Sequence, residues 1–188
     1  MAIDITPLIQ ERIECSIQAA KKYNFDPIIL LAVAATENGK PGQWVKNTNG
    51  THDVGAMQLN TAYLATLSKY GITANDVAKP GCYSYYLAAW RIKKHIVYDK
   101  NGDIWTKVSN YHSYTPKYNS RYRQKLIANA QQWKAKLNDF PYYVKSNREN
   151  KGITVTTTAT QEPVNINFTQ SDKATSSVVW RSSTPIIQ

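Results

Sequence analysis

One carboxyl group in this sequence occupies a position suited to acid catalysis. Glu37 lies near the end of the most apolar stretch, residues 30–39, and it is the only glutamate between Glu14 and Glu149. Burial against apolar neighbours and the negative end of a helix dipole both favour the protonated carboxyl, so we expect a raised pKa. A carboxylic acid that stays protonated near neutral pH can protonate the leaving oxygen of a glycosidic bond. The simpler interpretation is a carboxyl that only hydrogen-bonds a backbone group at the helix end.

Two later segments carry side chains suited to binding a sugar. Residues 55–60 combine a glycine that permits close backbone approach, a thioether and side-chain amides, and residues 110–122 are rich in tyrosine. The candidate binding residues are Met57, Gln58, Asn60, Tyr111 and His112. Each segment also has a structural interpretation, since Asn60 can be an ordinary N-cap of a helix and Tyr118 can face a core.

The elements that must position these residues are mainly helices, because capping residues stand where the apolar periodicity begins. Expected helices follow Thr6-Pro7, Asp26-Pro27, Asn60, Asp103 and Thr115-Pro116, with a short turn before Pro80 and a longer helix from Tyr86 to Ile96. We expect the second helix to end at Gly39 and, being apolar nearly all round, to lie at the centre of the core. Residues 43–55 predict a loop or small strands. The last helix is expected to turn one face inward: Tyr118, Tyr122, Leu126, Trp133 and Leu137.

The composition changes after Phe140-Pro141, where Thr, Ser, Asn and Gln dominate. Val164, Ile166 and Phe168 alternate with polar residues, and residues 178–180 form a second apolar patch. A hairpin is possible there, although an extended flexible tail is favoured because an isolated two-stranded hairpin is marginal in water. We therefore expect a helical domain over residues 6–139 and a Thr/Ser-rich tail over residues 140–188.

Composition and charge exclude several classes of protein. The chain has 188 residues, of which 42% are hydrophobic, which is enough for one core and excludes disorder as a whole. The longest apolar run, residues 28–35, is too short to span a membrane. The net charge of +10 favours anionic partners, namely nucleic acid, phospholipid headgroups or a carboxylate-bearing wall polymer. Nucleic acid is disfavoured because Lys and Arg are spread along the chain instead of marking one recognition helix.

Taken together, four motifs resemble those of a known family. Glu37 with Asn38-Gly39, then Gly55-x-Met57-Gln58-Leu59-Asn60, then Tyr111, then Tyr122 are similar in order and spacing to the soluble lytic transglycosylase domain, which is related to goose-type lysozyme. The resemblance covers about residues 12 to 138. It implies a mainly α, lysozyme-like fold with a small β or loop wall near residues 43–56. The sequence departs from the family pattern at Asn38, where Ser is usual, and at His112, where Asn is commoner.

The resemblance also implies a reaction and a set of roles. Glu37 would cleave the β-1,4 bond between N-acetylmuramic acid and N-acetylglucosamine in peptidoglycan strands, with formation of a 1,6-anhydro product, and Tyr122 would orient it. This reaction needs one carboxyl group, whereas a glycoside hydrolase commonly needs two. No cofactor or metal is expected, since His52, His95 and His112 show no ligand spacing.

A closer resemblance concerns the stretch Tyr111-His112-Ser113-x-Thr115-Pro116. It looks like that of the small transglycosylases that accompany conjugation and type IV secretion machines, in which a disulfide joins the positions of Cys15 and Cys82. A disulfide implies an oxidising compartment, so we expect a periplasmic or cell-envelope protein whose signal peptide is absent from this sequence. We expect the tail to contact proteins of the secretion apparatus.

Two other functions remain open at this point. The first is a lysozyme-type hydrolase in which Asp53 positions a water molecule. The second is a non-catalytic peptidoglycan-binding scaffold of a secretion system. The retained Glu37 favours an enzyme over the scaffold.

Overall fold

The computed structural model describes residues 6–138, 165–166, 178–181 and 184–187. Its helices are α1 (Pro7–Lys22), α2 (Pro27–Glu37), α3 (Thr61–Leu67), the 3₁₀ helix η1 (Ser68–Tyr70), α4 (Ala74–Ala78), α5 (Tyr83–Tyr98), α6 (Ile104–Ser109) and α7 (Pro116–Asn138). Its strands are β1 (Trp44–Lys46), β2 (His52–Val54), β3 (Leu59–Asn60), β4 (Asn165–Ile166), β5 (Val178–Arg181) and β6 (Thr184–Ile187). The mainly α fold with a small sheet is therefore confirmed.

The helices begin where the capping residues predict. The side chains of Thr6, Asp26, Asn60 and Asp103 each accept a hydrogen bond from a backbone N–H in the first turn that follows. These bonds satisfy donors that a helix leaves without an intrahelical partner. Proline at the first position of α1 and α2 adds a backbone angle already suited to a helix.

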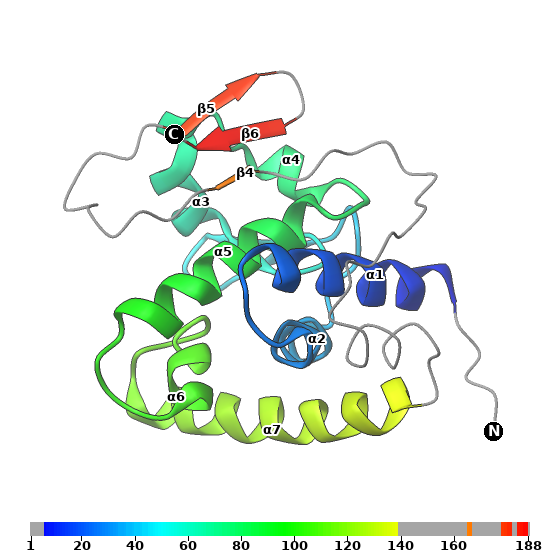
Figure 1. Ribbon diagram of the computed structural model, residues 1–188. Helices are drawn as coiled ribbons and strands as arrows, with labels where there is room; N and C mark the ends of the chain where they lie inside the picture. Colours follow the sequence, from blue (N-terminus) through cyan, green and yellow to red (C-terminus); the bar gives the residue numbers. More distant parts are fainter. Residues whose placement is uncertain (1–5, 139–164, 167–177, 182–183, 188) are drawn as a thin grey trace.

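Helix α2 lies at the centre of the core, as its composition predicts. Every residue from Ile28 to Ala34 is buried. In Figure 1, α2 is seen nearly end-on between α1 and the long α7, and α7 is its most extensive partner. Because α2 is surrounded, the side chain at its last position, Glu37, is placed by several elements at once.

The end of α2 differs in detail from the prediction. Asn38, and not Gly39, adopts the left-handed conformation that ends the helix, with φ of 50°. Gly39 is required for another reason: a Cβ atom there would collide with the carbonyl oxygen of Gly55 and lie 2.8 Å from that of Ala56. This close backbone approach holds residues 55–58 against the end of α2.

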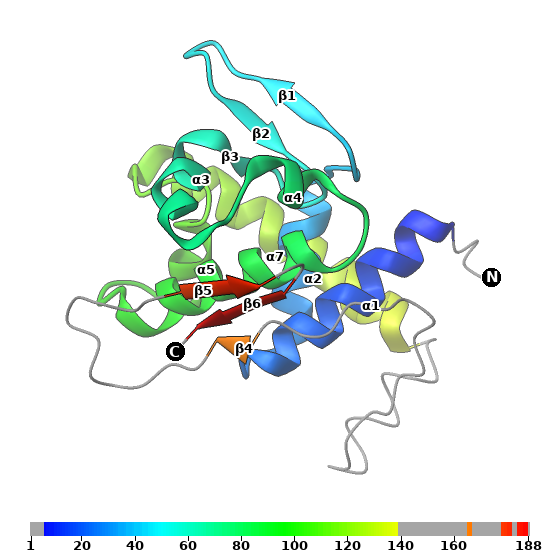
Figure 2. The ribbon, with the colours of Figure 1, turned by 90° about the horizontal axis from the view of Figure 1, so that it is seen from above.

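The expected small wall is a three-stranded antiparallel sheet in the order β1-β2-β3. Trp44 pairs with Val54 and Lys46 with His52, so β1 and β2 form a hairpin that projects from the helices (Figure 2). Strand β2 continues to its pairing with β3 through Asp53 and Asn60. The sheet thereby joins the hairpin to the segment that approaches Glu37.

One residue of the predicted inner face of α7 is exposed. Tyr122, Leu126, Trp133 and Leu137 are buried, whereas Tyr118 is 51% exposed, so the prediction for Tyr118 is wrong. Tyr122 already meets Glu37, the last residue of α2, and Tyr118 lies one turn beyond that contact. Helical periodicity predicted the correct face of α7. It could not predict where along α7 the contact with α2 ends.

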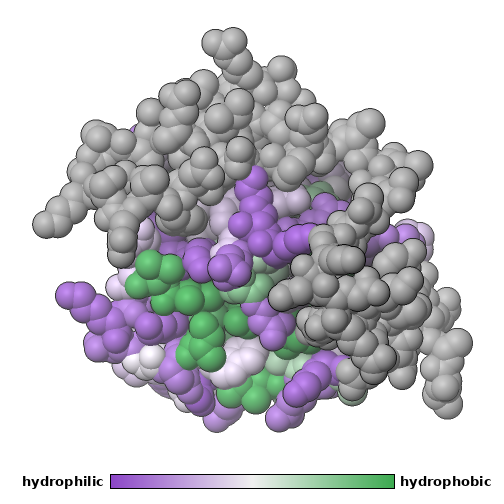
Figure 3. Space-filling view, in the orientation of Figure 1, coloured by the Kyte–Doolittle hydropathy of each residue, from purple (hydrophilic) through white to green (hydrophobic). Residues whose placement is uncertain are grey.

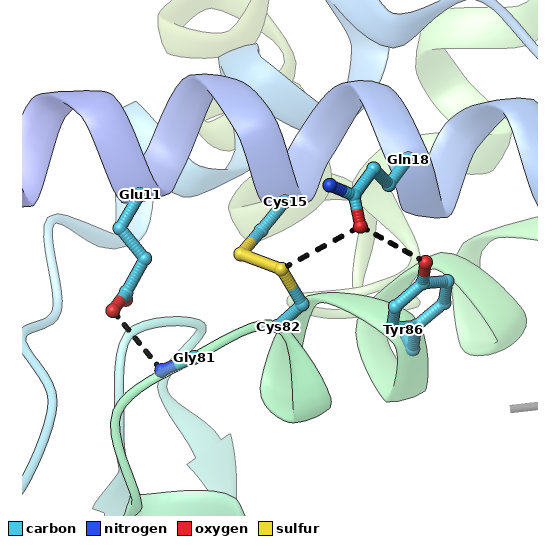
Figure 4. The surroundings of a disulfide bond; sticks show 6 residues. All are labelled: Glu11, Cys15, Gln18, Gly81, Cys82 and Tyr86. Carbon is cyan, nitrogen blue, oxygen red and sulfur yellow. Dashed lines mark hydrogen bonds between the residues drawn. A yellow bond between two sulfur atoms is a disulfide. The ribbon is translucent and has the colours of Figure 1, made fainter. Parts of the chain in front are cut away.

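A disulfide joins α1 to the start of α5, as the resemblance implied. Cys15 and Cys82 are bonded with a Cα–Cα distance of 4.8 Å (Figure 4). The backbone N–H of Gly81 donates to Glu11 at 3.0 Å, and the Tyr86 hydroxyl donates to Gln18 at 3.4 Å. These bonds fasten the turn before α5 and the first turn of α5 to α1, one on each side of the disulfide.

The tail contains a β-hairpin within its described part. β5 pairs antiparallel with β6, and β4 pairs parallel with β6. The apolar patch at residues 178–180 is thus a strand, but its hairpin partner is β6, which was not predicted. Val164 and Phe168 lie outside the described residues. Within the described part, no helix combines the length and the hydrophobicity that crossing a membrane requires.

Candidate active site

Glu37 and Tyr122 meet although 85 residues separate them in the sequence. The Tyr122 hydroxyl donates a hydrogen bond of 2.5 Å to Oε1 of Glu37, and the Tyr122 side chain is buried in the face of α7 that packs on α2. The contact fixes one oxygen of the carboxyl group. It therefore joins the first and the last of the four motifs.

The environment of Glu37 favours its protonated form, as expected. The pKa of Glu37 is raised from its ordinary value of 4.5 to about 7, chiefly by burial and in smaller part by the charge of Asp53. The bond from Tyr122 and the charges of Arg91 and Lys125 act in the opposite direction. Because burial dominates, a carboxyl group is available that both gives and takes a proton near neutral pH.

The backbone and side chains around Glu37 are themselves held in place. Thr36 donates to the carbonyl of Ala32 at 2.7 Å and accepts from the side-chain amide of Asn129 at 2.9 Å. Asn129 lies seven residues after Tyr122 and therefore on the same face of α7. This spacing is the signal by which the sequence could have indicated that Asn129 belongs to the site. The guanidinium of Arg12 reaches the carbonyl of Gly39 at 3.5 Å.

Tyr111 joins two of the predicted binding segments underneath the carboxyl group. Its hydroxyl donates to the backbone carbonyl of Met57 at 2.7 Å. Tyr111 is only 4% exposed and Met57 is fully buried, so the Met57 thioether, proposed from the sequence as a binding group, is not accessible to a sugar in this structure. Both residues therefore belong to the core beneath the surface of the site.

The two predicted amide ligands differ in how their donors are used. Gln58 is partly buried, has a positive φ of 47° and donates to the carbonyl of Gly55 at 2.9 Å. Asn60 donates to Asp53 at 2.8 Å and to Thr51 at 2.9 Å, while its oxygen caps α3. Asn60 thus acts as the N-cap of the structural interpretation, and both its amide protons are engaged within the protein.

His112 lies against the Tyr122–Glu37 pair. Its ring stacks on the Tyr122 ring with a centroid distance of 4.8 Å and an angle of 5° between the planes. Burial lowers the pKa of His112, and the charge of Lys125 lowers it further. A neutral imidazole that covers Tyr122 leaves ring nitrogens for a ligand while adding no charge beside Glu37.

Arg91 belongs to the site although no sequence motif contains it. Its guanidinium stacks on the rings of Tyr63 and Tyr111, with distances of 4.2 and 4.7 Å to the centroids. Only the tertiary structure brings α3, α5 and the segment after α6 together at this point.

A second group of polar side chains lies on the other side of residues 110–114 and is called the Asp99 cluster here. Its members are His95, Asp99, Asn110, Tyr114 and Asn119. All but His95 line an open groove of about 780 Å³ between the end of α5, α6 and the start of α7. On the face shown in Figure 3, hydrophobic side chains gather in the lower part, with hydrophilic side chains among and beside them.

The described residues offer no group of three or more His, Cys, Asp or Glu side chains that could hold a metal ion. His52 is in edge contact with Trp44, His95 belongs to the Asp99 cluster, and His112 stacks on Tyr122. The three histidines therefore lie in three separate surroundings.

The fold and the motif geometry agree with a comparison against known families. The model of the transglycosylase SLT domain matches residues 14–133, and the chain belongs to this family. Membership implies a lytic transglycosylase-like enzyme whose substrate is peptidoglycan. The resemblance drawn from the four motifs is thereby confirmed.

Individual relatives are also similar over most of their length. Invasion protein IagB of Salmonella typhimurium is 31% identical over 122 residues, which are 62% of this chain and 74% of that protein, and the Salmonella typhi protein of the same name gives the same values. Protein IpgF of Shigella flexneri is 29% identical over 105 residues, 55% of this chain and 68% of that protein.

Proposed function

We propose that the protein cleaves the β-1,4 bond between N-acetylmuramic acid and N-acetylglucosamine in peptidoglycan and leaves a 1,6-anhydromuramic acid end. The observation that carries this proposal is the Glu37 carboxyl group, which accepts a hydrogen bond from Tyr122 and whose pKa is raised to about 7 by burial. Family membership supplies the substrate. The chemistry then follows from a group that can act first as an acid and then as a base.

In the first half of the proposed reaction, protonated Glu37 gives its proton to the glycosidic oxygen as the bond to C1 of muramic acid breaks. In the second half, the C6 hydroxyl of the same muramic acid forms a bond to C1 and loses its proton to Glu37. No water is consumed, and Glu37 regains the proton that it gave. An acid with a pKa near the working pH is suited to both steps.

The other site residues have supporting roles in this proposal. Tyr122 orients Glu37 through the 2.5 Å hydrogen bond, and His112 covers Tyr122. Gln58 and His112 offer polar atoms to the glycan. Met57, Tyr111 and Asn60 act from below by holding the segment that carries Gln58.

A hydrolase is the second candidate, because Asp53 lies close enough to raise the pKa of Glu37 electrostatically. A hydrolase would use Asp53 to place an attacking water molecule. The hydrogen bond from Asn60 at 2.8 Å holds the Asp53 carboxylate, which gives it a structural role in the sheet as well.

Product analysis separates the two reactions. Purified sacculi are digested with the full chain, with Glu37→Gln and with Asp53→Asn, and the soluble muropeptides are identified by mass spectrometry. We expect anhydro ends from the wild type and from Asp53→Asn, and no release by Glu37→Gln. Reducing ends that disappear in Asp53→Asn would establish the hydrolase, and binding to sacculi without release of fragments would establish a scaffold.

We further propose that the enzyme acts in the cell envelope and opens the wall for a conjugation or type IV secretion apparatus. The Cys15–Cys82 disulfide supports an oxidising compartment. The resemblance of residues 111–116 to the conjugation-type transglycosylases supports the link to a secretion apparatus, and two relatives are named invasion proteins. Residues 6–139 would form the catalytic domain, and residues 140–188 would contact the apparatus.

Deletion of residues 141–188 tests this division. We expect the shortened protein to release muropeptides in vitro at the rate of the full chain, while transport in cells decreases. Loss of muropeptide release in vitro would contradict the division, and unchanged transport would contradict the proposed contact with the apparatus.

A further inference from the structure

Arg91 is held between two aromatic rings beside the site. It projects from α5, and its guanidinium lies 4.2 Å from the ring centroid of Tyr63 on α3 and 4.7 Å from that of Tyr111. Tyr111 is in turn fixed by its hydrogen bond to Met57. The two rings restrict the position of the guanidinium before any ligand arrives, which reduces the entropy lost on binding.

The hydrogen-bonding groups of Arg91 have no acceptor among the described residues: its contacts there are the two ring faces. A guanidinium carries five N–H donors in its plane, and ring stacking covers its faces without using them. Arg91 is only partly buried, so these donors are open to a ligand. A planar, preoriented cation of this kind is suited to a carboxylate, which can accept two parallel hydrogen bonds.

Arg91 is also close enough to influence the groups around the proposed scissile bond. Its charge lowers the pKa of Glu37 and opposes the shifts of Tyr111 and Tyr122. The other ionic side chains that act on Glu37 are Asp53, on β2, and Lys125, on α7. A carboxylate bound to Arg91 would offset the positive charge and keep Glu37 protonated in the complex.

We propose that Arg91 is the residue that recognises a carboxylate on the side branch of muramic acid. The inference rests on the proposed function, because it assigns a substrate group to the same site. Muramic acid differs from N-acetylglucosamine by a lactyl ether, whose carboxyl group is either free or amide-linked to a stem peptide with carboxylates of its own. Both sources present the same chemistry to Arg91.

Three substrates distinguish these sources: glycan strands with stem peptides, strands from which an amidase has removed the peptides, and peptide-free strands whose lactyl carboxylates have been converted to amides with carbodiimide and ammonia. The proteins are the full chain, Arg91→Gln, Arg91→Lys, and Lys94→Gln as a matched control on the same helix. Lys94 contacts the Trp90 ring and lies outside the proposed site.

We expect Arg91→Gln to lower kcat/KM by about 10- to 100-fold on a carboxylate-bearing substrate and by less than about threefold on the amidated strands, since a hydrogen bond to a charged group is lost only in the first case. The kcat/KM of Arg91→Lys should lie between those of the wild type and Arg91→Gln, and the kcat/KM of Lys94→Gln should match that of the wild type. A loss confined to the peptide-bearing strands identifies the stem peptide as the source, and a loss on both natural substrates identifies the lactyl group.

Equal losses on natural and amidated strands would overturn the proposal, because a residue that merely supports Tyr63 and Tyr111 does not sense the charge of the substrate. No loss on any strand would also overturn it. If Arg91→Gln does not fold, binding of natural and amidated strands to the Glu37→Gln protein decides instead, and equal affinities contradict the proposal. A wild-type protein that releases no anhydro product from any strand would contradict the proposed function itself.

Discussion

Two groups of tyrosine, carboxylic acid and histidine lie on opposite sides of residues 110–114, and they are built differently. The first contains Tyr122, Glu37 and His112, and the second contains Tyr114, Asp99 and His95. Glu37 accepts one hydrogen bond from a hydroxyl, that of Tyr122, at 2.5 Å. Asp99 accepts from Asn110 at 2.8 Å and from the Tyr114 hydroxyl at 3.4 Å, and it pairs with His95 at 2.9 Å.

The difference shows that surroundings, and not residue types, decide which carboxyl group is suited to catalysis. The lone pairs of Asp99 hold Asn110, whose oxygen accepts from Asn119 of α7 at 2.7 Å. Those bonds hold residues 110–114 in place, and this segment carries Tyr111 and His112 into the site of Glu37. The Asp99 cluster therefore acts as a support for residues 110–114, whereas burial raises the pKa of Glu37 to about 7.

Removing each carboxylate in turn gives the largest expected contrast. Glu37→Gln should lower kcat by about 1,000-fold or more, because the acid and base of the proposed reaction are lost together. Asp99→Asn should lower kcat by less than about tenfold, since it loosens only the support of residues 110–114. Muropeptide release from sacculi measures both. Similar losses in the two variants, at similar thermal stability, would contradict the division into catalytic group and support.

Removing the disulfide should affect both regions alike. The Cys15–Cys82 bond closes a loop of 67 residues that includes α2 and the sheet, so we expect the double variant with Cys15→Ser and Cys82→Ser to lose about 4 kcal/mol of unfolding free energy. Urea denaturation with and without reductant measures this loss. The ratio of the Glu37→Gln and Asp99→Asn effects on kcat should not change in the double variant. A changed ratio would show that the disulfide stabilises one of the two regions more than the other.

The two regions should respond to pH in opposite directions. The pKa of Glu37 is raised to about 7, so its proton stabilises the folded protein fully below about pH 4.5, and this contribution is lost as pH rises through about 7. Relative to Glu37→Gln, the wild type should lose about 3 kcal/mol of unfolding free energy over that range. Burial lowers the pKa of His95, so the wild type should lose stability relative to His95→Gln as pH falls below about 6.5.

Unfolding free energies of the three proteins between pH 4 and pH 8 measure both slopes. A wild-type curve parallel to that of Glu37→Gln would show that Glu37 does not carry a raised pKa. A wild-type curve parallel to that of His95→Gln would show that His95 does not carry a lowered pKa.

The last contrast concerns the two tyrosine hydroxyls. Tyr122→Phe should lower kcat by about 10- to 100-fold, because Glu37 loses its orienting donor, and the alkaline limb of the pH–rate profile should move up, since the Tyr122 bond lowers the pKa of Glu37. Tyr114→Phe should stay within about twofold of the wild type, because Tyr114 is 66% exposed and its hydroxyl contacts His95 at 3.1 Å and Asp99 at 3.4 Å, which belong to the support. An unshifted limb in Tyr122→Phe would contradict the orienting role.

Local signals in the sequence were sufficient for most of the helices. The caps at Thr6, Asp26, Asn60 and Asp103 were predicted correctly because a helix start is decided within one turn. The exposed Tyr118 and the strand β6 were not predicted correctly. In both cases the outcome depends on what a distant element covers or pairs with, which local periodicity does not contain.

The candidate site was predicted in part. The four motifs indicated Glu37 and Tyr122, and the structure brings the two side chains into contact. The motifs did not indicate Arg91 or Asn129, because each acts through side chains from other helices. Met57 and Asn60 belong to a predicted motif, but their burial and their internal hydrogen bonds follow from packing.

The sequence by itself determined the family, the helical framework and the identity of the one glutamate at the end of an apolar helix. These properties depend on residue types and on spacings of a few residues. The resemblance also implied that Tyr122 orients Glu37, and the structure shows their contact. Only the tertiary structure decided that Asp99 is a support and that Arg91 lies between two tyrosine rings. Each of these depends on how helices far apart in the sequence pack together, and that packing sets the burial and the hydrogen-bond partners that determine the chemistry of a carboxyl group.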